Sequence, residues 1–92
     1  MTPDEAIGLA IKQSRVDQGL SQESIGASQS FVSDVERGKK SVSIQRLDAF
    51  AQCLGVQPAS LMVKATLLAN PHITMEDLFE SIRAELTKHR KS

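Results

Sequence analysis

The segment from Ala27 to Lys40, ASQSFVSDVERGKK, combines two kinds of side chain that can do chemistry. Gln29 can pair with adenine through two hydrogen bonds, and the serine hydroxyls can donate to or accept from several bases. The Lys and Arg side chains near its end can contact phosphates and release their counterions. Val32 and Val35 lie at helical spacing, so the segment is either a helix that reads DNA or an amphipathic core helix with a basic end.

The composition is that of one small globular domain built from helices. The chain has 92 residues, of which 40% are hydrophobic and 24% are charged, with three Phe and no Trp or Tyr. A chain of this size holds one core. Five Gly, three Pro and little alternation of β-branched residues predict an all-α protein whose core consists of Leu, Ile, Val, Ala and Met.

We expect neither a membrane segment nor a secretory signal. No apolar run approaches the ~18 residues of a membrane span, and the N-terminus is acidic before it is apolar. The single Cys53 excludes an intramolecular disulfide and fits a reducing, cytoplasmic setting. We interpret Cys53 as a small core residue on a helix.

The charge is neutral overall but uneven along the chain. Eleven Lys and Arg side chains balance eleven Asp and Glu side chains. Residues 11–46 carry six bases and four acids, a balance of +2, and residues 81–92 carry four bases and one acid, a balance of +3. Because affinity for phosphate depends on local clusters, the neutral total does not exclude a nucleic-acid partner, although it predicts modest non-specific binding.

Capping residues and apolar periodicity predict six helices. Ser21, Ser28 and Ser43 are the expected N-caps of the second, third and fourth helices. Thr74, with Asp77 three residues later, has the spacing of a capping box before the last helix. The predicted helices span about 4–18, a short stretch after Ser21, 29–37, 44–54, 58–70 and 75–89.

Two short helices joined by a tight turn, the second opening with small hydrogen-bonding residues, are the arrangement of a helix-turn-helix. The second of these must offer its first turn to the major groove, so bulky residues there would block its approach. Val32 and Val35 can hold its inner face against the first and fourth helices of the chain. The N-termini of the two helices can direct backbone N–H groups at phosphates.

The segment GLSQESIGASQSFVSDVERGKKSVSIQRLDAFAQCLGV resembles the Cro/C1-type (XRE family) helix-turn-helix regulators. That family has Gly-Leu-(Ser/Thr)-Gln at the start of the second helix, Ser-x-Ser-(aromatic)-(Ile/Val)-Ser at the start of the third, (Ile/Val/Leu)-Glu-Arg-Gly-Lys at its close, and Leu-Gly-Val after the fourth. The similarity covers about residues 5–68 and implies a compact five-helix, lambda repressor-like domain, followed here by a sixth helix. Between LSQE and ERG the chain is shorter than the usual family spacing by about one helical turn, which we assign to the end of the second helix.

The resemblance implies roles for the residues at matching positions. The positions of the third helix that face base edges are Gln29, Ser30, Ser33 and Asp34. The positions that contact backbone phosphates are Gln22, Ser28, Arg37, Lys39, Lys40 and Arg46. Arg15 and Glu36 match a pair that forms a partly buried salt bridge between the first and third helices, and Gln22 also braces the reading helix.

Some residues of this segment keep alternative roles. A carboxylate at Asp34 repels phosphate unless it accepts from a cytosine amino group, and otherwise it would pair with Arg37 or Lys39. Phe31 could contact a thymine methyl or could lie at the solvent edge or in the core. Lys39 and Lys40 would be an ordinary solvated loop if they did not follow the third helix.

No arrangement of residues predicts catalysis, a metal site or a cofactor. His72 and His89 are 17 positions apart, with no Cys or acid at metal-ligand spacing, and we expect both at the surface. We find no carboxylate pair, Gly-rich phosphate loop or nucleophile–base pair that would support a reaction. The chain is therefore not expected to be an enzyme.

Residues 71–92 are expected to form a C-terminal helix with a basic tail, appended to a domain of residues 1–70. Its apolar stripe either packs on its own domain or pairs with another chain. High specificity from one short reading helix normally needs two copies on half-sites about one helical turn apart, ~34 Å. We therefore predict at least a homodimer, with the interface candidates Leu61, Leu68, Leu78, Ile82 and Leu86.

Together these features predict a cytoplasmic, sequence-specific DNA-binding transcriptional regulator that occupies a palindromic operator in double-stranded DNA as a dimer or higher oligomer. Repression by steric block is favoured over activation. The alternative is a protein-interaction module that uses the same fold to bind a protein partner, as an antitoxin or anti-repressor does. Co-purification of a second small protein would favour this alternative.

Overall fold

The computed structural model describes residues 1–88, and all regular secondary structure in that range is helical. The elements are α1 (Pro3–Asp17), the 3-10 turn η1 (Gln22–Ile25), α2 (Gln29–Glu36), α3 (Ile44–Leu54), α4 (Pro58–Ala69) and α5 (Met75–Lys88). The predicted all-α class is confirmed. The predicted basic tail, which includes His89, lies outside the described residues. None of the helices within residues 1–88 is long and apolar enough to cross a membrane.

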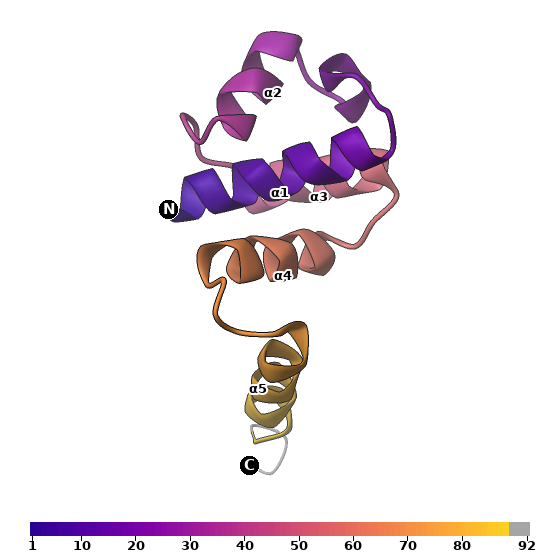
Figure 1. Ribbon diagram of the computed structural model, residues 1–92. Helices are drawn as coiled ribbons and strands as arrows, with labels where there is room; N and C mark the ends of the chain where they lie inside the picture. The colour runs from indigo at the N-terminus through magenta and orange to yellow at the C-terminus, as the bar shows by residue number, and fades with distance from the viewer. Residues whose placement is uncertain (89–92) are drawn as a thin grey trace.

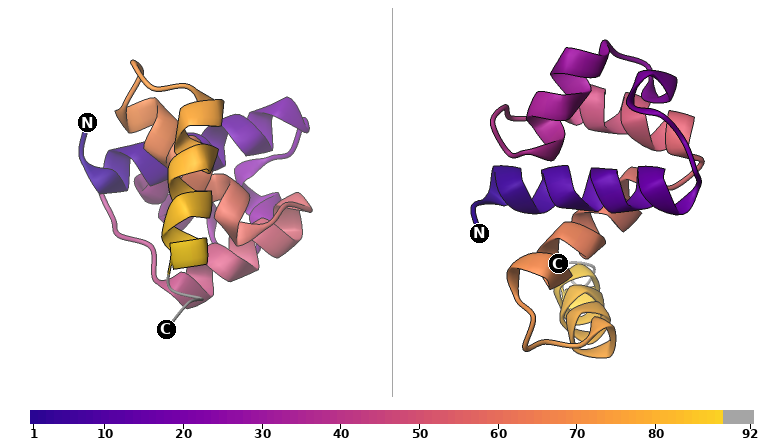
Figure 2. Two further views of the ribbon diagram at one scale, coloured as in Figure 1. Left: turned by 90° about the horizontal axis from the view of Figure 1, so that it is seen from below. Right: turned by 45° about the horizontal axis from the view of Figure 1, so that its top comes forward.

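Helix α1 is the central element of the fold (Figure 1). It packs against α4 on one side and α2 on the other, and it also contacts α3. The 3-10 turn η1 lies next to α2 and α3, at the end of the molecule farthest from α5. Helix α5 contacts α4 and projects away from the other helices, as Figure 1 and the right view of Figure 2 show.

The core forms where α1, η1, α2, α3 and α4 meet. Its largest fully buried side chains are Ile11, Ile25, Val32, Val35 and Phe50. A second, smaller cluster at the contact of α1 and α4 consists of the alanines at positions 6, 10 and 65. Because alanine side chains are small, the two helices can approach closely there.

Side-chain caps determine where the helices begin. The hydroxyls of Ser28 and Ser43 each accept a hydrogen bond from the backbone amide three residues further on, at 3.3 and 3.0 Å. At α5 the Thr74 hydroxyl accepts from the Asp77 amide at 3.0 Å, and the Asp77 carboxylate accepts from the Thr74 amide at 3.3 Å. These predicted caps are confirmed. Thr2 forms a further capping box with Glu5 at the start of α1. This box was not predicted from the sequence, although its two residues have the same spacing as Thr74 and Asp77.

The element before α2 differs from the helix expected there. It is a single 3-10 turn of four residues, in which the Ser24 amide donates to the Ser21 carbonyl at 3.1 Å. The Ser21 hydroxyl lies 2.7 Å from the Ser24 hydroxyl and does not cap the helix. Gly26 has a φ of 90° and ends the turn. Four residues are too few for an α-helix with several i to i−4 bonds, which agrees with a segment that is short by about one turn.

Two side chains do not lie where the sequence predicts them. Cys53 is exposed, so its interpretation as a core residue is wrong. The buried stripe of α3 ends with Ala51 and Leu54, and Cys53 lies beside that stripe. Leu61 was expected at an oligomer interface, but its residue exposure is 2% and it belongs to the main core. Its side chain is therefore covered by the other core residues of the same chain.

Helices α1 and α2 touch backbone to backbone at Gly8. A Cβ atom at Gly8 would overlap the carbonyl oxygen of Val35 and would lie 3.2 Å from the carbonyl carbon of Glu36. A residue without a side chain therefore allows α2 to lie this close to α1.

We expect Gly8→Ala to lower the free energy of unfolding by about 1–3 kcal/mol, because the added methyl group would push α2 away from α1. Alanine is the better helix former by about 1 kcal/mol, so helix propensity alone predicts the opposite sign. Urea denaturation, monitored by circular dichroism, measures the difference in the free energy of unfolding. Val16→Ala, at a position of the same helix that is 55% exposed, is the control and should change stability by less than about 0.5 kcal/mol. An increase in stability on Gly8→Ala would contradict the close contact.

Candidate nucleic-acid interface

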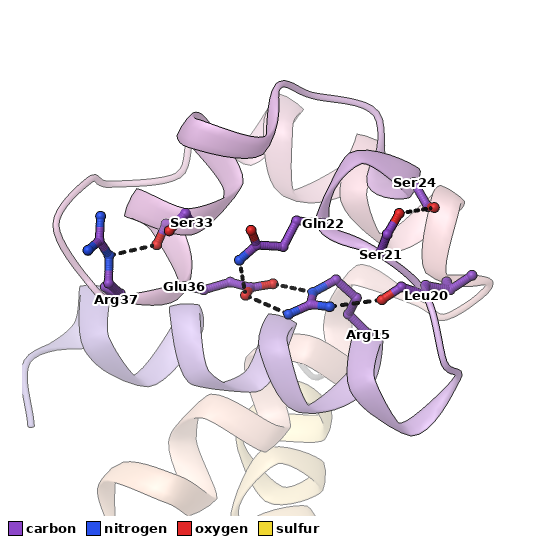
Figure 3. Close-up of polar contacts among 8 residues, drawn as sticks. All are labelled: Arg15, Leu20, Ser21, Gln22, Ser24, Ser33, Glu36 and Arg37. Atoms are coloured by element: carbon purple, nitrogen blue, oxygen red, sulfur yellow. Dashed lines mark hydrogen bonds and ion pairs between the residues drawn. The ribbon is translucent and has the colours of Figure 1, made fainter.

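A buried ion pair holds the C-terminal end of α2 against α1 (Figure 3). The Glu36 carboxylate accepts hydrogen bonds from two guanidinium nitrogens of Arg15, from Nε at 2.7 Å and from Nη2 at 2.9 Å. The side chain of Glu36 is 2% exposed and that of Arg15 is 12% exposed. Hydrogen bonding to Glu36 raises the pKa of Arg15 above its ordinary value, so the guanidinium remains charged. These two residues thus form the ion pair that the family resemblance implies.

Two further groups connect this ion pair to the chain between α1 and α2. The third guanidinium nitrogen of Arg15, Nη1, donates to the Leu20 carbonyl at 2.8 Å. The side-chain amide of Gln22 donates to the Glu36 carboxylate at 3.0 Å (Figure 3). An amide nitrogen carries two hydrogens, so Gln22 can brace Glu36 and still offer one N–H to another acceptor.

The first turn of α2 is exposed and polar. Ser28, Gln29 and Ser30 are all exposed, whereas Val32 and Val35 are fully buried. The Ser28 hydroxyl caps the helix and lies 3.5 Å from the Ser30 hydroxyl. Within residues 1–88 no hydrogen bond engages the side chain of Gln29. These three residues therefore offer donors and acceptors to a ligand at the start of α2.

Ser33 and Asp34 lie further along α2 and are half-buried. Atom Oδ1 of Asp34 accepts a hydrogen bond from Nη2 of Arg37 at 2.8 Å, and Oδ2 lies 3.7 Å from Nζ of Lys40. Of the two roles considered for Asp34, the structure shows ion pairing. Its second partner is Lys40, where the sequence suggested Lys39.

Phe31 brings two of the basic side chains together. The guanidinium carbon of Arg46 lies 4.7 Å from the centroid of the Phe31 ring, and Nζ of Lys40 lies 5.4 Å from it. The same ring packs on Phe50, with centroids 6.4 Å apart. Phe31 thus lies at the edge of the core and orders cations from the loop and from α3. Sequence reasoning missed this role, because no local spacing connects Phe31 to residues nine and fifteen positions away.

The loop that carries Lys39 and Lys40 is anchored on the start of α1. Gly38 adopts a φ of 75° and packs against Glu5, where a Cβ atom would lie 2.6 Å from Cγ of the glutamate. Beyond the lysines, the Ser41 hydroxyl donates to the Asp4 carboxylate at 2.9 Å. Both ends of the loop are therefore held, although both lysines are exposed.

Three of the six residues predicted to contact phosphate lie together in the structure. Asp34 joins Arg37 to Lys40, and Phe31 joins Lys40 to Arg46, so three cations form one cluster. Lys39 precedes Lys40 in the chain, and within residues 1–88 no ion pair involves it. The other two candidates lie elsewhere: Ser28 at the start of α2 and Gln22 in η1.

We expect Glu36→Ala to lower the free energy of unfolding by about 3 kcal/mol, because Arg15 would remain largely buried without a counter-charge. Urea denaturation measures the loss. Asp17→Ala is the control, since it removes an exposed 4.0 Å contact with Lys64 and should cost less than about 1 kcal/mol.

A double replacement distinguishes the lost charge pair from lost packing. Arg15→Met combined with Glu36→Leu keeps much of the side-chain volume and removes both charges, so it should recover most of the stability that Glu36→Ala loses. Equal stability of Glu36→Ala and Asp17→Ala would contradict the importance of the pair.

Comparison with known proteins agrees with this geometry. The model of a helix-turn-helix family matches residues 11–61. The crystal structure of the clp gene regulator ClgR from Corynebacterium glutamicum is similar, with a TM-score of 0.68 and 30% sequence identity over 72% of this chain and 91% of that chain. Another structure of ClgR from that organism has a TM-score of 0.68 and 24% identity, over 96% of this chain and 89% of that chain, and supports the fold alone. A sequence comparison with curated proteins gave no significant match.

The family match spans more than half of the chain. It contains η1, α2 and α3 and therefore the ion pair of Arg15 with Glu36, the exposed first turn of α2 and the cluster of cations. The chain belongs to the Cro/C1-type (XRE) family of helix-turn-helix DNA-binding transcription regulators.

Proposed function

We propose that the protein is a sequence-specific transcriptional regulator that inserts the first turn of α2 into the major groove of an operator. Gln29, Ser30 and Ser33 would meet base edges, and Asp34 would do so only after leaving Arg37. Phosphate contacts would position the helix without reading sequence. The candidates for these contacts are Gln22, Ser28, Arg37, Lys39, Lys40 and Arg46.

The observation that carries this proposal is a polar, exposed first turn on a helix that is fixed at its other end. A reading helix must keep its orientation while its first turn contacts bases, because displacement by a fraction of a hydrogen-bond length loses the discrimination between bases. The buried pair of Arg15 and Glu36 supplies that rigidity. The three clustered cations lie at the C-cap of this helix, on the loop that follows it and at the start of α3. A phosphate backbone that flanks the groove would pass there.

We also propose a homodimer on a palindromic operator, with α5 in the interface. Within this helix no residue is buried by the rest of the chain. Leu78 and Ile82 are half-buried, and Leu86 is 64% exposed. Met75 and Phe79, which are 50% and 44% exposed, extend the same stripe. Covering such a stripe with a second chain would remove apolar surface from water.

An apolar groove of about 610 Å³ lies between α4 and α5 and supports the same proposal. Val63 and Leu67 of α4 face Met75 and Phe79 of α5 across it. Leu68 is half-buried and packs against the alanine cluster of α1 and α4, so it would contribute at the margin. The division of the chain into residues 1–70 and 71–92 is part of this proposal.

Repression by steric block is the mode of action that we favour, because occupation of a promoter suffices for it. We place this action in the cytoplasm, in agreement with a single unpaired cysteine. The groove beside α5 also suits an apolar helix of another protein, which supports an antitoxin-like interaction module as the second candidate. A stoichiometric complex with a second small protein would favour that candidate over the homodimer.

Two sets of substitutions should separate base contacts from phosphate contacts. We expect Gln29→Ala and Ser30→Ala to weaken binding to the preferred duplex by about 1–3 kcal/mol each and to relax the base preference. Lys39→Ala combined with Lys40→Ala should weaken binding to all duplexes alike and make the slope of log K against log salt shallower by about 2. Selection from random duplex DNA, followed by gel-shift titrations at several salt concentrations, measures both effects.

Lys64→Ala is the matched control, since Lys64 lies on α4 and contacts Asp17 at 4.0 Å. It removes one positive charge away from α2 and should leave the base preference unchanged and the salt slope nearly so. If Gln29→Ala and Ser30→Ala keep the affinity and preference of the natural protein, α2 is not the reading helix. An unchanged slope would remove Lys39 and Lys40 from the phosphate contacts.

Removal of α5 should reduce the oligomer. We expect a chain that ends at Asn70 to have a smaller mass by light scattering, because the apolar stripe of α5 is lost. In the full chain Leu86→Glu should have the same effect, whereas Ala84→Glu, on the opposite face of α5, should keep the mass of the natural protein. An unchanged mass for both the shortened chain and Leu86→Glu would contradict an interface at α5.

A further inference from the structure

A carboxylate lies among the cations that are proposed to contact phosphate. Asp34 is on α2, one turn beyond Ser30, with its side chain 30% exposed. One of its oxygens lies 2.8 Å from Nη2 of Arg37, and the other lies 3.7 Å from Nζ of Lys40. Both oxygens are therefore directed at cations.

The two cations remain accessible to other anions. The side chains of Arg37 and Lys40 are 57% and 51% exposed. Ion pairs at such exposure are weak, because solvent screens them. A DNA phosphate can therefore take either cation from Asp34, but it must compete with a carboxylate that is already in place.

The cost of this competition applies to any complex in which phosphates take Arg37 and Lys40 from Asp34. Non-specific binding depends almost entirely on phosphate contacts, and a specific complex adds base contacts that do not depend on these cations. The same free-energy cost therefore enters both complexes. An intramolecular anion at this place lowers both affinities by a similar factor.

We propose that Asp34 competes with DNA phosphate for Arg37 and Lys40 and so limits the affinity of the protein for duplex DNA of any sequence. This inference rests on the proposed function. It assigns Asp34 a role in the free protein that differs from a contact with cytosine.

The test compares substitutions that change the charge by the same amount at different places. Asp34→Asn removes the carboxylate with nearly the same volume, and Asp34→Ser is a second neutral variant in case the first does not fold. Asp17→Asn is the matched control, because Asp17 is 74% exposed on α1 and lies 4.0 Å from Lys64, away from α2. Circular dichroism checks the fold of each protein.

The measurement is fluorescence anisotropy with a labelled duplex of random sequence and with the duplex selected by the natural protein, over a range of salt. We expect Asp34→Asn to bind the random duplex roughly 3- to 10-fold more tightly, since release from weak surface pairs has effects of this size. The slope of log K against log salt should become steeper by about one to two, because up to two more counterions are released. Affinity for the selected duplex should rise by a similar factor, and Asp17→Asn should resemble the natural protein.

A double-mutant cycle tests the mechanism. In a protein that carries Arg37→Ala and Lys40→Ala, the further change Asp34→Asn should no longer raise the affinity for random duplex. If the increase persists in that background, Asp34 acts by direct repulsion of phosphate and the competition is refuted. Equal behaviour of Asp34→Asn and Asp17→Asn would also overturn it. So would a loss of preference at one base pair of the selected duplex without a change in non-specific affinity, which would make Asp34 a base contact.

The same data separate this inference from the proposed function. If the natural protein selects a duplex sequence and Asp34→Asn behaves like Asp17→Asn, only the inferred role of Asp34 is refuted, and the proposed function stands. If the natural protein selects no sequence and shows no salt-dependent affinity for duplex DNA, the proposed function and this inference fall together.

Discussion

A buried carboxylate at the end of α2 is the constraint on which the rest of the site depends. Removal of Glu36 from water without a counter-charge would cost several kcal/mol, and the two-nitrogen contact with Arg15 offsets that cost. Because Arg15 also binds the Leu20 carbonyl and Gln22 also binds Glu36, one ion pair ties α1, the connecting loop, η1 and α2 together. Helix α2 is therefore oriented from its C-terminal end, and its polar first turn is left exposed.

The cationic surface beside α2 depends on the same closeness of α1 and α2. Gly8 lets the two backbones touch, and the turn at Gly38 then meets the start of α1. Because the start of the loop is fixed there, Lys40 lies near the ring of Phe31. Arg46 of α3 lies near the same ring. Cations from the loop and from α3 thus meet at a residue that also packs on the core, and Asp34 joins Arg37 to Lys40.

Helix α5 differs from the other elements in how it packs. Five elements contribute side chains to the main core, whereas α5 contacts α4 and has no buried residue. Its capping box at Thr74 and Asp77 stabilises its start but does not bury its apolar stripe. Within residues 1–88, five elements thus share one core, and the apolar stripe of α5 stays largely exposed.

The sequence by itself determined the helical class, most helix starts and the location of α2, because caps and periodicity act between residues three or four positions apart. The pair of Arg15 and Glu36 was accessible through the family motif, since no local rule links residues 21 positions apart. Only the tertiary structure decided that Asp34 pairs with Lys40, because that contact depends on the path of a loop. It also decided that Leu61 is buried and Leu86 is exposed, although both lie on apolar stripes and both were predicted at an oligomer interface. Periodicity shows that a helix face is apolar, but whether the same chain covers that face depends on how the helices pack, and within residues 1–88 the core covers Leu61 and leaves Leu86 exposed.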